Sequence, residues 1–171
     1  MRKWLVFGGS AAAAFVVGAL ITYPRDAEAF WRSASALYCT VNGRDMNWGS
    51  YSVANNSTTT AMSLSCRIPN DSNGLFHGDG GPNATTLTVN GDWNSGTSVL
   101  AYACYSNWST NSGSCGSSAS ASSNPYSISP PITGAGSWAS APDGATPYLV
   151  VSLGTQYNGT NNTLRGYYIS Y

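Results

Sequence analysis

The stretch "TAMSLSCRI" (Thr60–Ile68) places an apolar residue at every second position over most of its length, which predicts a β-strand with one buried face. Met62, Leu64 and Cys66 share one side of this strand, and two serines lie on the other side. The pleat of a β-strand explains the spacing, because successive side chains point to opposite faces of the sheet. The stretch therefore predicts a sheet that packs on a core with one face only.

The same alternation recurs in six further segments, and no segment after residue 30 has helical periodicity of useful length. These segments are residues 35–41, 49–55, 85–93, 97–106, 147–153 and 163–171. Asn-Gly dipeptides predict turns, because both residues tolerate a positive φ. The four dipeptides are Asn42–Gly43, Asn73–Gly74, Asn90–Gly91 and Asn158–Gly159. About seven or eight short strands with such turns predict an all-β antiparallel sandwich, Ig-like or jelly-roll-like, with a barrel as the alternative.

Two stretches are predicted to be connections rather than strands. Residues 113–125, "GSCGSSASASSNP", are of low complexity and predict an exposed loop. Residues 129–147 contain several prolines, which argue against a central strand because proline cannot donate to a sheet.

The N-terminal residues have the order of a secretory signal peptide. A positive start at Arg2 and Lys3 precedes an uncharged, mostly apolar run at residues 5–21, and a small-x-small cleavage signature follows. An uncleaved membrane anchor is the alternative, because the run is near the lower length limit for spanning a bilayer. We expect residues 1–29 to be removed and residues 30–171 to form one domain that is secreted, held at the cell surface or periplasmic.

The four cysteines agree with export. Cys39, Cys66, Cys104 and Cys115 are an even set, so two disulfides are expected in a secreted chain. Three pairings are possible, and the pairing of nearest neighbours, Cys39–Cys66 with Cys104–Cys115, is preferred. The chain-entropy model assigns about 3 to 4 kcal/mol to each loop. A zinc site is disfavoured, because there is no CxxC pair and the spacings fit no standard finger.

The charge of the expected mature chain is close to zero. Residues 30–171 contain no lysine and no glutamate, and four arginines stand against five aspartates. Such a surface does not attract nucleic acid or anionic lipid by steering or counterion release. We expect no nucleic-acid partner, and a membrane contact only through the N-terminal segment if it stays uncleaved.

Several motifs together resemble a known group of proteins. Cys39 lies in an early predicted strand, "SLSCRIP" (Ser63–Pro69) ends a later one, and "LAYACYS" (Leu100–Ser106) carries another cysteine. With the closing "LRGYYISY" (Leu164–Tyr171), these motifs resemble uncharacterised secreted bacterial proteins of the kind found in myxobacteria. The chain departs from their pattern in having "CRIP" where "CP" is usual. The resemblance implies a disulfide-bonded β-sandwich outside the cytoplasm and assigns no activity.

The stretch "LFHGDGGPN" (Leu75–Asn83) holds the single histidine, His77. Histidine can act as a general base, but the chain offers no second histidine for zinc, no free thiol if both disulfides form, and no G-x-S-x-G elbow. A solvated loop histidine is therefore expected. Asp71, Asn73 and Asp79 form a weak calcium candidate that lacks the further acid and the glutamate of an EF-hand. We expect no cofactor.

Tryptophans near predicted loops are the candidate ligand contacts. Trp48, Trp93 and Trp108 lie beside Asn, Ser or Gly, and Asn107 precedes Trp108 in the loop that a Cys104–Cys115 bridge would close. A tryptophan face can stack on a sugar ring while amides bind its hydroxyls. The alternative is that two or three tryptophans fill the core of the sandwich.

These observations predict a non-catalytic recognition or adhesion module, with a glycan or another cell-surface polymer as its ligand. A structural subunit of an extracellular assembly is the alternative, because sheet edges without lysine permit association. The segment "FWRSASALY" (residues 30–38) could then add a strand to a neighbouring copy. A secreted hydrolase is the third and least favoured function. Two aspartates would have to act as its catalytic acids, but every aspartate after residue 30 falls in a predicted turn, where aspartate is common for structural reasons.

Overall fold

The computed structural model describes residues 31–42, 46–49, 51–68, 84–107, 109–142 and 145–170. These residues form eleven strands and two short 3-10 helices. The strands are β1 (Trp31–Ser35), β2 (Cys39–Asn42), β3 (Met46–Trp48), β4 (Val53–Asn55), β5 (Met62–Arg67), β6 (Thr86–Asp92), β7 (Val99–Asn107), β8 (Ser112–Ser120), β9 (Tyr126–Ile128), β10 (Thr146–Leu153) and β11 (Asn162–Ser170). The helices are η1 (Ala36–Tyr38) and η2 (Trp138–Ser140).

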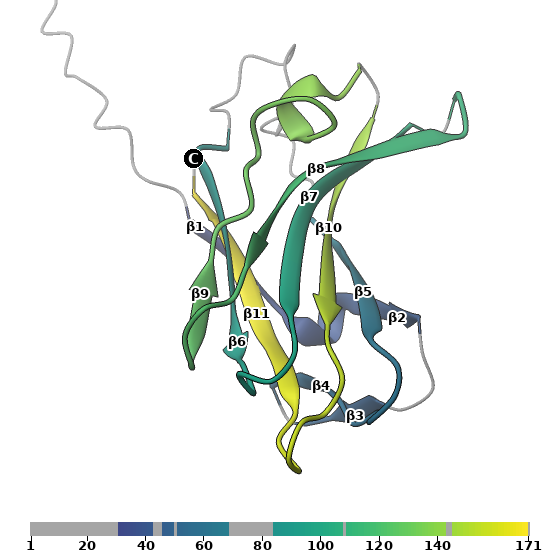
Figure 1. Ribbon diagram of the computed structural model, residues 1–171. Helices are drawn as coiled ribbons and strands as arrows, with labels where there is room; N and C mark the ends of the chain where they lie inside the picture. The colour runs from purple at the N-terminus through teal and green to yellow at the C-terminus, as the bar shows by residue number, and fades with distance from the viewer. Residues whose placement is uncertain are drawn as a thin grey trace, which may run out of the picture.

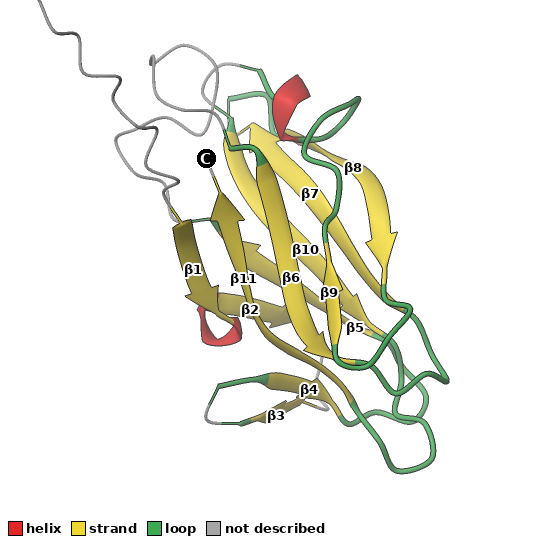
Figure 2. Ribbon diagram, turned by 90° about the vertical axis from the view of Figure 1, so that its left-hand side faces the viewer, coloured by secondary structure: helices red, strands yellow, loops and turns green. Residues whose placement is uncertain are grey.

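The strands form two antiparallel sheets that pack face to face (Figure 1). Sheet A has the order β3-β4-β11-β6-β9, and β1 also pairs with β11. Sheet B has the order β2-β5-β10-β7-β8. Figure 2 shows β1, β11, β6 and β9 in front of sheet B, with β3 and β4 at the lower end. The predicted all-β sandwich with two disulfides is confirmed, and it contains more strands than the seven or eight expected.

Most connections run from one sheet to the other. Among the described strands, only β3–β4 and β7–β8 are hairpins between consecutive strands of one sheet. The segment from β1 through η1 to β2 therefore passes from sheet A to sheet B along one side of the sandwich. This crossing places residues of β1 and η1 beside the outer edge of sheet B.

The core follows from the alternation that the sequence shows most clearly in β5. Met62, Leu64 and Cys66 are buried, and the residues between them are exposed. The inner faces of β7, β10 and β11 supply further fully buried aliphatic side chains, which include Val99, Leu149, Val151, Leu153 and Leu164. The long connection after β9 adds Ile132 and Trp138 to the core. Burial of this apolar surface is the main favourable term in folding.

Both disulfides have the expected pairing, and both lie in sheet B. Cys39 and Cys66 pair across β2 and β5, and both side chains belong to the core. Cys104 and Cys115 pair across the β7–β8 hairpin. Cys104 lies opposite Tyr148, on the side of sheet B that faces away from the core, because the adjoining pair of Ala103 and Leu149 is buried inside.

Three predictions of local structure are wrong. Residues 35–41 were expected to form one strand, but Ala36–Tyr38 form the 3-10 helix η1, and β2 begins only at Cys39. The largest error is β8. Residues 113–125 were expected to form a loop, but Ser112–Ser120 pairs with β7 as a nine-residue edge strand. Most of its side chains are small and exposed, so hydrophobic alternation could not reveal it. Asn90–Gly91 is not a turn either, because it lies inside β6 and Gly91 packs beneath Tyr126.

The Asn158–Gly159 turn is confirmed, since both residues have positive φ, 47° and 74°. The turns expected at Asn42–Gly43 and Asn73–Gly74 lie partly or wholly outside the described residues. The segment considered for strand addition to a neighbour is occupied within the chain, because Trp31–Ser35 pairs with β11 as β1.

Three buried asparagines join the loops at the end of the sandwich where β3 and β4 lie. The amide oxygen of Asn162 accepts a hydrogen bond from the backbone N–H of Asn94 at 2.9 Å, and its nitrogen donates to Thr97 Oγ1 at 2.7 Å. Asn55 donates to the backbone carbonyls of Leu153 and Gly154. Buried amides of this kind are stable only when they are hydrogen-bonded, so the network explains how polar loops can close this end.

Candidate functional site

The outer face of sheet B is polar and is marked by one charged residue and two tyrosines. The strand registers place Arg67 of β5 directly opposite Tyr148 of β10, and Tyr148 opposite Cys104 of β7. The neighbouring row contains Ser65, opposite Val150, and Val150 lies opposite Tyr102. Directly opposed residues of an antiparallel pair have Cβ atoms about 4.5–5.5 Å apart, so these side chains are neighbours.

A groove of about 930 Å³ opens beside this row. Sheet B contributes polar and aromatic residues to its lining, which include Thr40, Ser65, Arg67, Ser106, Thr146 and Tyr148. The other side is formed by Ser33 and Ala34 of β1, by Tyr38 of η1 and by Ile68, which follows β5. We call this site the β5 groove. Its volume lies at the upper end of the range of ordinary small-molecule sites.

Tyr38 lies on η1, in the passage between the two sheets. Its side chain is 71% exposed, which is unusual for a large aromatic residue, while Ala36 of the same helix is fully buried. The side chain of Ser35 caps η1 by accepting a hydrogen bond from the backbone N–H of Leu37 at 3.3 Å. The helix η1 is therefore held against the core by Ala36, and the side chain of Tyr38 lines the groove.

Buried aromatic side chains hold the backbone beneath the groove. The hydroxyl of Tyr167 donates to the carbonyl oxygen of Arg67, across the sandwich from sheet A. The indole N–H of Trp138 donates to the carbonyl oxygen of Tyr148 at 3.2 Å. Burial raises the pKa of Tyr167 to about 12, so its hydroxyl remains a donor throughout the physiological range. Arg67 and Tyr148 thus stand on backbone positions that are fixed from within the core.

The charge of Arg67 is not neutralised by any carboxylate in the described part of the chain. Asp92 is the single acidic residue among the described residues, and it pairs with Arg165 on sheet A. The guanidinium of Arg165 contacts both carboxylate oxygens of Asp92, at 2.6 and 3.1 Å. The two arginines therefore differ, because Arg165 serves a structural ion pair and Arg67 faces the groove.

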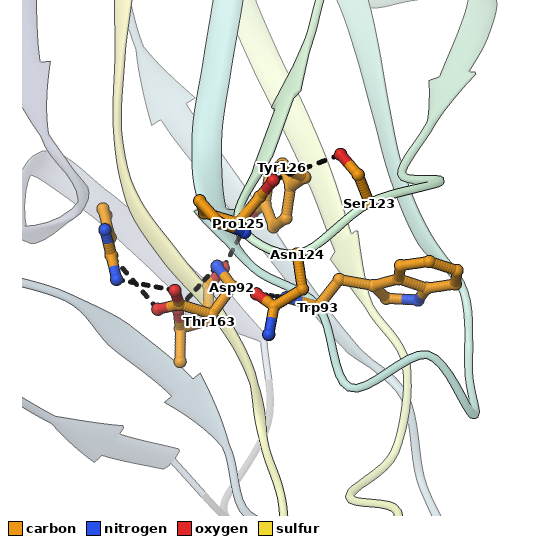
Figure 3. A network of polar contacts seen from close by, with 8 residues as sticks. Asp92, Trp93, Ser123, Asn124, Pro125, Tyr126 and Thr163 are labelled. Atoms are coloured by element: carbon orange, nitrogen blue, oxygen red, sulfur yellow. Dashed lines mark hydrogen bonds and ion pairs between the residues drawn. The ribbon is translucent and has the colours of Figure 1, made fainter.

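Asp92 belongs to a structural network at the end of β6 (Figure 3). Its carboxylate accepts a hydrogen bond from Thr163 Oγ1 at 2.8 Å, and the hydroxyl of Tyr126 donates to the carbonyl of Thr163 at 2.8 Å. Burial, and to a smaller extent the nearby Asp92, raise the pKa of Tyr126 well above its ordinary value. Each polar group is used within the network, so Asp92 is not poised as a catalytic acid or base.

Of the four ligand contacts expected from the sequence, Trp93 and Asn107 lie at opposite ends of the sandwich. Trp93 directly follows Asp92 at one end of the sandwich (Figure 3). Its indole N–H donates to the carbonyl of Thr97 at 2.6 Å, and its ring packs against the core. Trp48 lies in β3 at the same end, and only its backbone is described. Asn107 ends β7 at the opposite end (Figure 1).

Asn107 is buried and shapes its own turn, because its side-chain oxygen accepts hydrogen bonds from the N–H and the hydroxyl of Ser109. Trp108 lies outside the described residues, as do His77 and the calcium candidates Asp71, Asn73 and Asp79. Within the described part of the chain, no cluster of three metal-ligating side chains is found.

The residues of the β5 groove were missed by sequence reasoning because they are ordinary strand residues. The sequence marks them only as the exposed residues of an alternating pattern, in which Arg67 follows two serines on the outer face of β5. Only the pairing of β5 with β10 places a tyrosine beside this arginine, and the pairing joins residues far apart in the sequence.

Two disulfides are typical of a chain that folds in an oxidising environment, outside the cell or in the periplasm. Neither 3-10 helix in the described part of the chain has the length and apolar character needed to cross a membrane. In comparisons with protein-family models, with curated proteins and with solved structures, no significant match to the chain was found.

Proposed function

We propose that this protein is a secreted or surface-held, non-catalytic recognition module that binds carbohydrate in the β5 groove. One observation carries the proposal: the groove joins exposed or half-exposed tyrosines with an arginine and with serine and threonine hydroxyls, on a rigid sheet. Tyr38 and Tyr148 offer apolar ring faces with polar tips, and the hydroxyls can replace the water around a sugar.

The proposed absence of catalysis is supported by the chemistry of the lining. No aspartate, glutamate or histidine is among the described residues of the groove, so these residues offer no carboxylate pair for glycoside hydrolysis and no base for acyl transfer. Binding by stacking and hydrogen bonding needs none of these groups. Export is supported by the N-terminal segment and by the two disulfides.

The direct test is a glycan array with the purified, oxidised protein, followed by titration calorimetry with the strongest hit. Tyr148→Ala should weaken binding about 2- to 10-fold, because aromatic contacts contribute about 0.5–1.5 kcal/mol beyond their buried area. Tyr51→Ala is the matched control, since Tyr51 is 80% exposed and does not line the groove. Absence of binding to every glycan, or equal losses in both variants, would contradict the proposal.

A structural role in an extracellular assembly is the second candidate, and β8 favours it. Ser112–Ser120 is an edge strand of nine residues without a charged side chain, and no described strand pairs with its outer edge. Natural edge strands are normally protected by lysine, proline or a bulge. β8 has an irregularity in its register near Cys115, and the loop at Gly136 and Ser137 packs against it there. Two copies could pair the remainder of these edges around a two-fold axis.

Analytical ultracentrifugation over a wide concentration range separates the two candidates. If β8 mediates assembly, Ser118→Lys should dissociate the oligomer, whereas Ser63→Lys, on an exposed position of the interior strand β5, should leave it intact. A protein that stays monomeric at the highest concentration rules out the assembly role and leaves the recognition role unaffected.

A further inference from the structure

The β5 groove is electrically asymmetric, and Arg67 is the reason. Arg67 is the single charged side chain among the described residues of its lining, which otherwise offer hydroxyls, aromatic rings and apolar groups. Asp92, the single acid in the described part of the chain, is already held by Arg165 on the other sheet. A ligand in the groove would therefore meet Arg67 as an exposed cation that is not paired with any carboxylate of the described residues.

We infer that the β5 groove selects a saccharide bearing a carboxylate, such as a uronic acid unit, and that Arg67 binds this carboxylate. The inference rests on the proposed carbohydrate-binding function and deepens it. A planar guanidinium presents paired N–H donors that match the two oxygens of a carboxylate, and such bidentate pairs are stronger than bonds between neutral groups.

The position of Arg67 suits a charged sugar better than a phosphate. A single arginine supplies one positive charge, which matches the single negative charge of a carboxylate, whereas phosphate sites usually gather several donors or backbone N–H groups. Tyr148, directly across from Arg67, places an aromatic ring one strand spacing away. The distance between neighbouring strands, about 4.8 Å, is comparable with the width of a pyranose ring, so one sugar unit can contact both residues.

The backbone contacts strengthen the case, because they fix both residues before the ligand arrives. Tyr167 holds the carbonyl of Arg67, and Trp138 holds the carbonyl of Tyr148. The register fixes which side chain faces which, so the spacing of cation and ring is a property of the sheet. The backbone at both residues is therefore set before binding, and preorganisation of this kind favours affinity.

The experiment compares one oligosaccharide in two forms, tri-galacturonate and its methyl ester, in which a methyl group on each carboxyl removes the negative charge. Calorimetry with the wild-type protein should show binding of the acid form about 10- to 100-fold tighter than the ester, as expected for hydrogen bonds to a charged group. Arg67→Gln should remove this preference, and Arg67→Lys should retain part of it. The melting temperature of each variant shows that it is folded, as expected for an exposed side chain.

Three outcomes separate the inference from the function on which it rests. A preference for the acid form that disappears in Arg67→Gln supports both. Equal binding of the acid and the ester by the wild type, unchanged in Arg67→Gln, overturns the role of Arg67 but keeps the proposed function. Absence of binding to charged and neutral glycans alike overturns the proposed function and the inference together.

Discussion

Alanine in place of Gly91 should destabilise the protein more than its position in an Asn-Gly dipeptide suggests. Gly91 lies within β6, opposite Leu164 of β11 and Tyr126 of β9. A Cβ atom there would lie 2.6 Å from Cζ of Tyr126, and the Tyr126 hydroxyl and the carbonyl oxygen of Thr163 would be closer still. The clash involves backbone as well as a buried ring, so it cannot be relieved by moving one flexible side chain.

The size of the effect follows from two terms. Overpacking of a closely packed site costs about 1–3 kcal/mol, and displacement of the Tyr126 ring breaks its 2.8 Å hydrogen bond to Thr163, which contributes about 1 kcal/mol. The lower chain entropy of alanine in the unfolded state returns about 0.5–1 kcal/mol. We therefore expect Gly91→Ala to lower the free energy of unfolding by about 1–3.5 kcal/mol.

Urea unfolding followed by tryptophan fluorescence measures this quantity, with Gly159→Ala as the matched control. Gly159 belongs to the other described Asn-Gly pair, has a φ of 74° and has no atom near its missing Cβ. Its replacement should cost about 0–1.5 kcal/mol, because the left-handed conformation costs alanine about 1–2 kcal/mol and its lower chain entropy in the unfolded state returns about 0.5–1 kcal/mol. If Gly91→Ala costs less than Gly159→Ala, the packing of Tyr126 over Gly91 is wrong, and Asn90–Gly91 behaves as an ordinary turn.

The remaining predictions concern the buried amides, the buried tyrosine and the disulfides. Asn162→Ala should cost about 3 kcal/mol in urea unfolding because it leaves buried partners unpaired, whereas Asn161→Ala, whose partners are more exposed, should cost less than about 1 kcal/mol; equal costs would contradict the network. Because burial raises the pKa of Tyr167 from 10.0 to about 12, the folded state keeps a proton that the unfolded state releases. The contribution of Tyr167 to the free energy of unfolding should therefore be fully present below pH 10 and be lost between about pH 10 and 12. In thermal unfolding over this pH range, Tyr167→Phe should show a smaller decline in stability than the wild type. Replacing Cys39 and Cys66 together by alanine should cost about 3.5 kcal/mol, more than the roughly 2.8 kcal/mol for the disulfide of the β7–β8 hairpin, because the separation is 27 residues against 11; the reverse order of urea midpoints would contradict the chain-entropy account.

Hydrophobic alternation predicted the interior strands because one face of each strand packs on the core and the other face is exposed or half-exposed to water. β5 alternates strictly between buried and exposed residues, and β10 alternates between buried and half-buried ones. The cysteine pairing was predictable as well, since each disulfide joins two cysteines that follow one another in the sequence. Both features follow from the order and spacing of residues along the chain, so they can be predicted without knowing how distant strands pair.

Features that depend on pairing between distant segments could not be predicted in the same way. β8 has no apolar face, and it is a strand because its backbone pairs with β7 and its cysteine is bonded to Cys104. Gly91 follows an asparagine as it would in a turn, but Tyr126 from another strand requires a glycine beneath its ring. The β5 groove likewise exists because β5 and β10 lie side by side, although Arg67 and Tyr148 are distant in the sequence.

The pairing of β1 with β11 has a mechanical consequence. Trp31 lies opposite Ser170, so the start of β1 and the end of β11 are at the same point of sheet A. A force applied between these two points breaks the hydrogen bonds of the pair one after another, as a zip opens, which requires less force than shearing them together. We expect β1 and η1 to peel away first under such a load. Unfolding from this end then stops at Cys39, because its covalent bond to Cys66 does not break at forces that break hydrogen bonds. The disulfide therefore acts as a mechanical stop, which keeps Arg67 and Tyr148 in place on sheet B while the first strand extends.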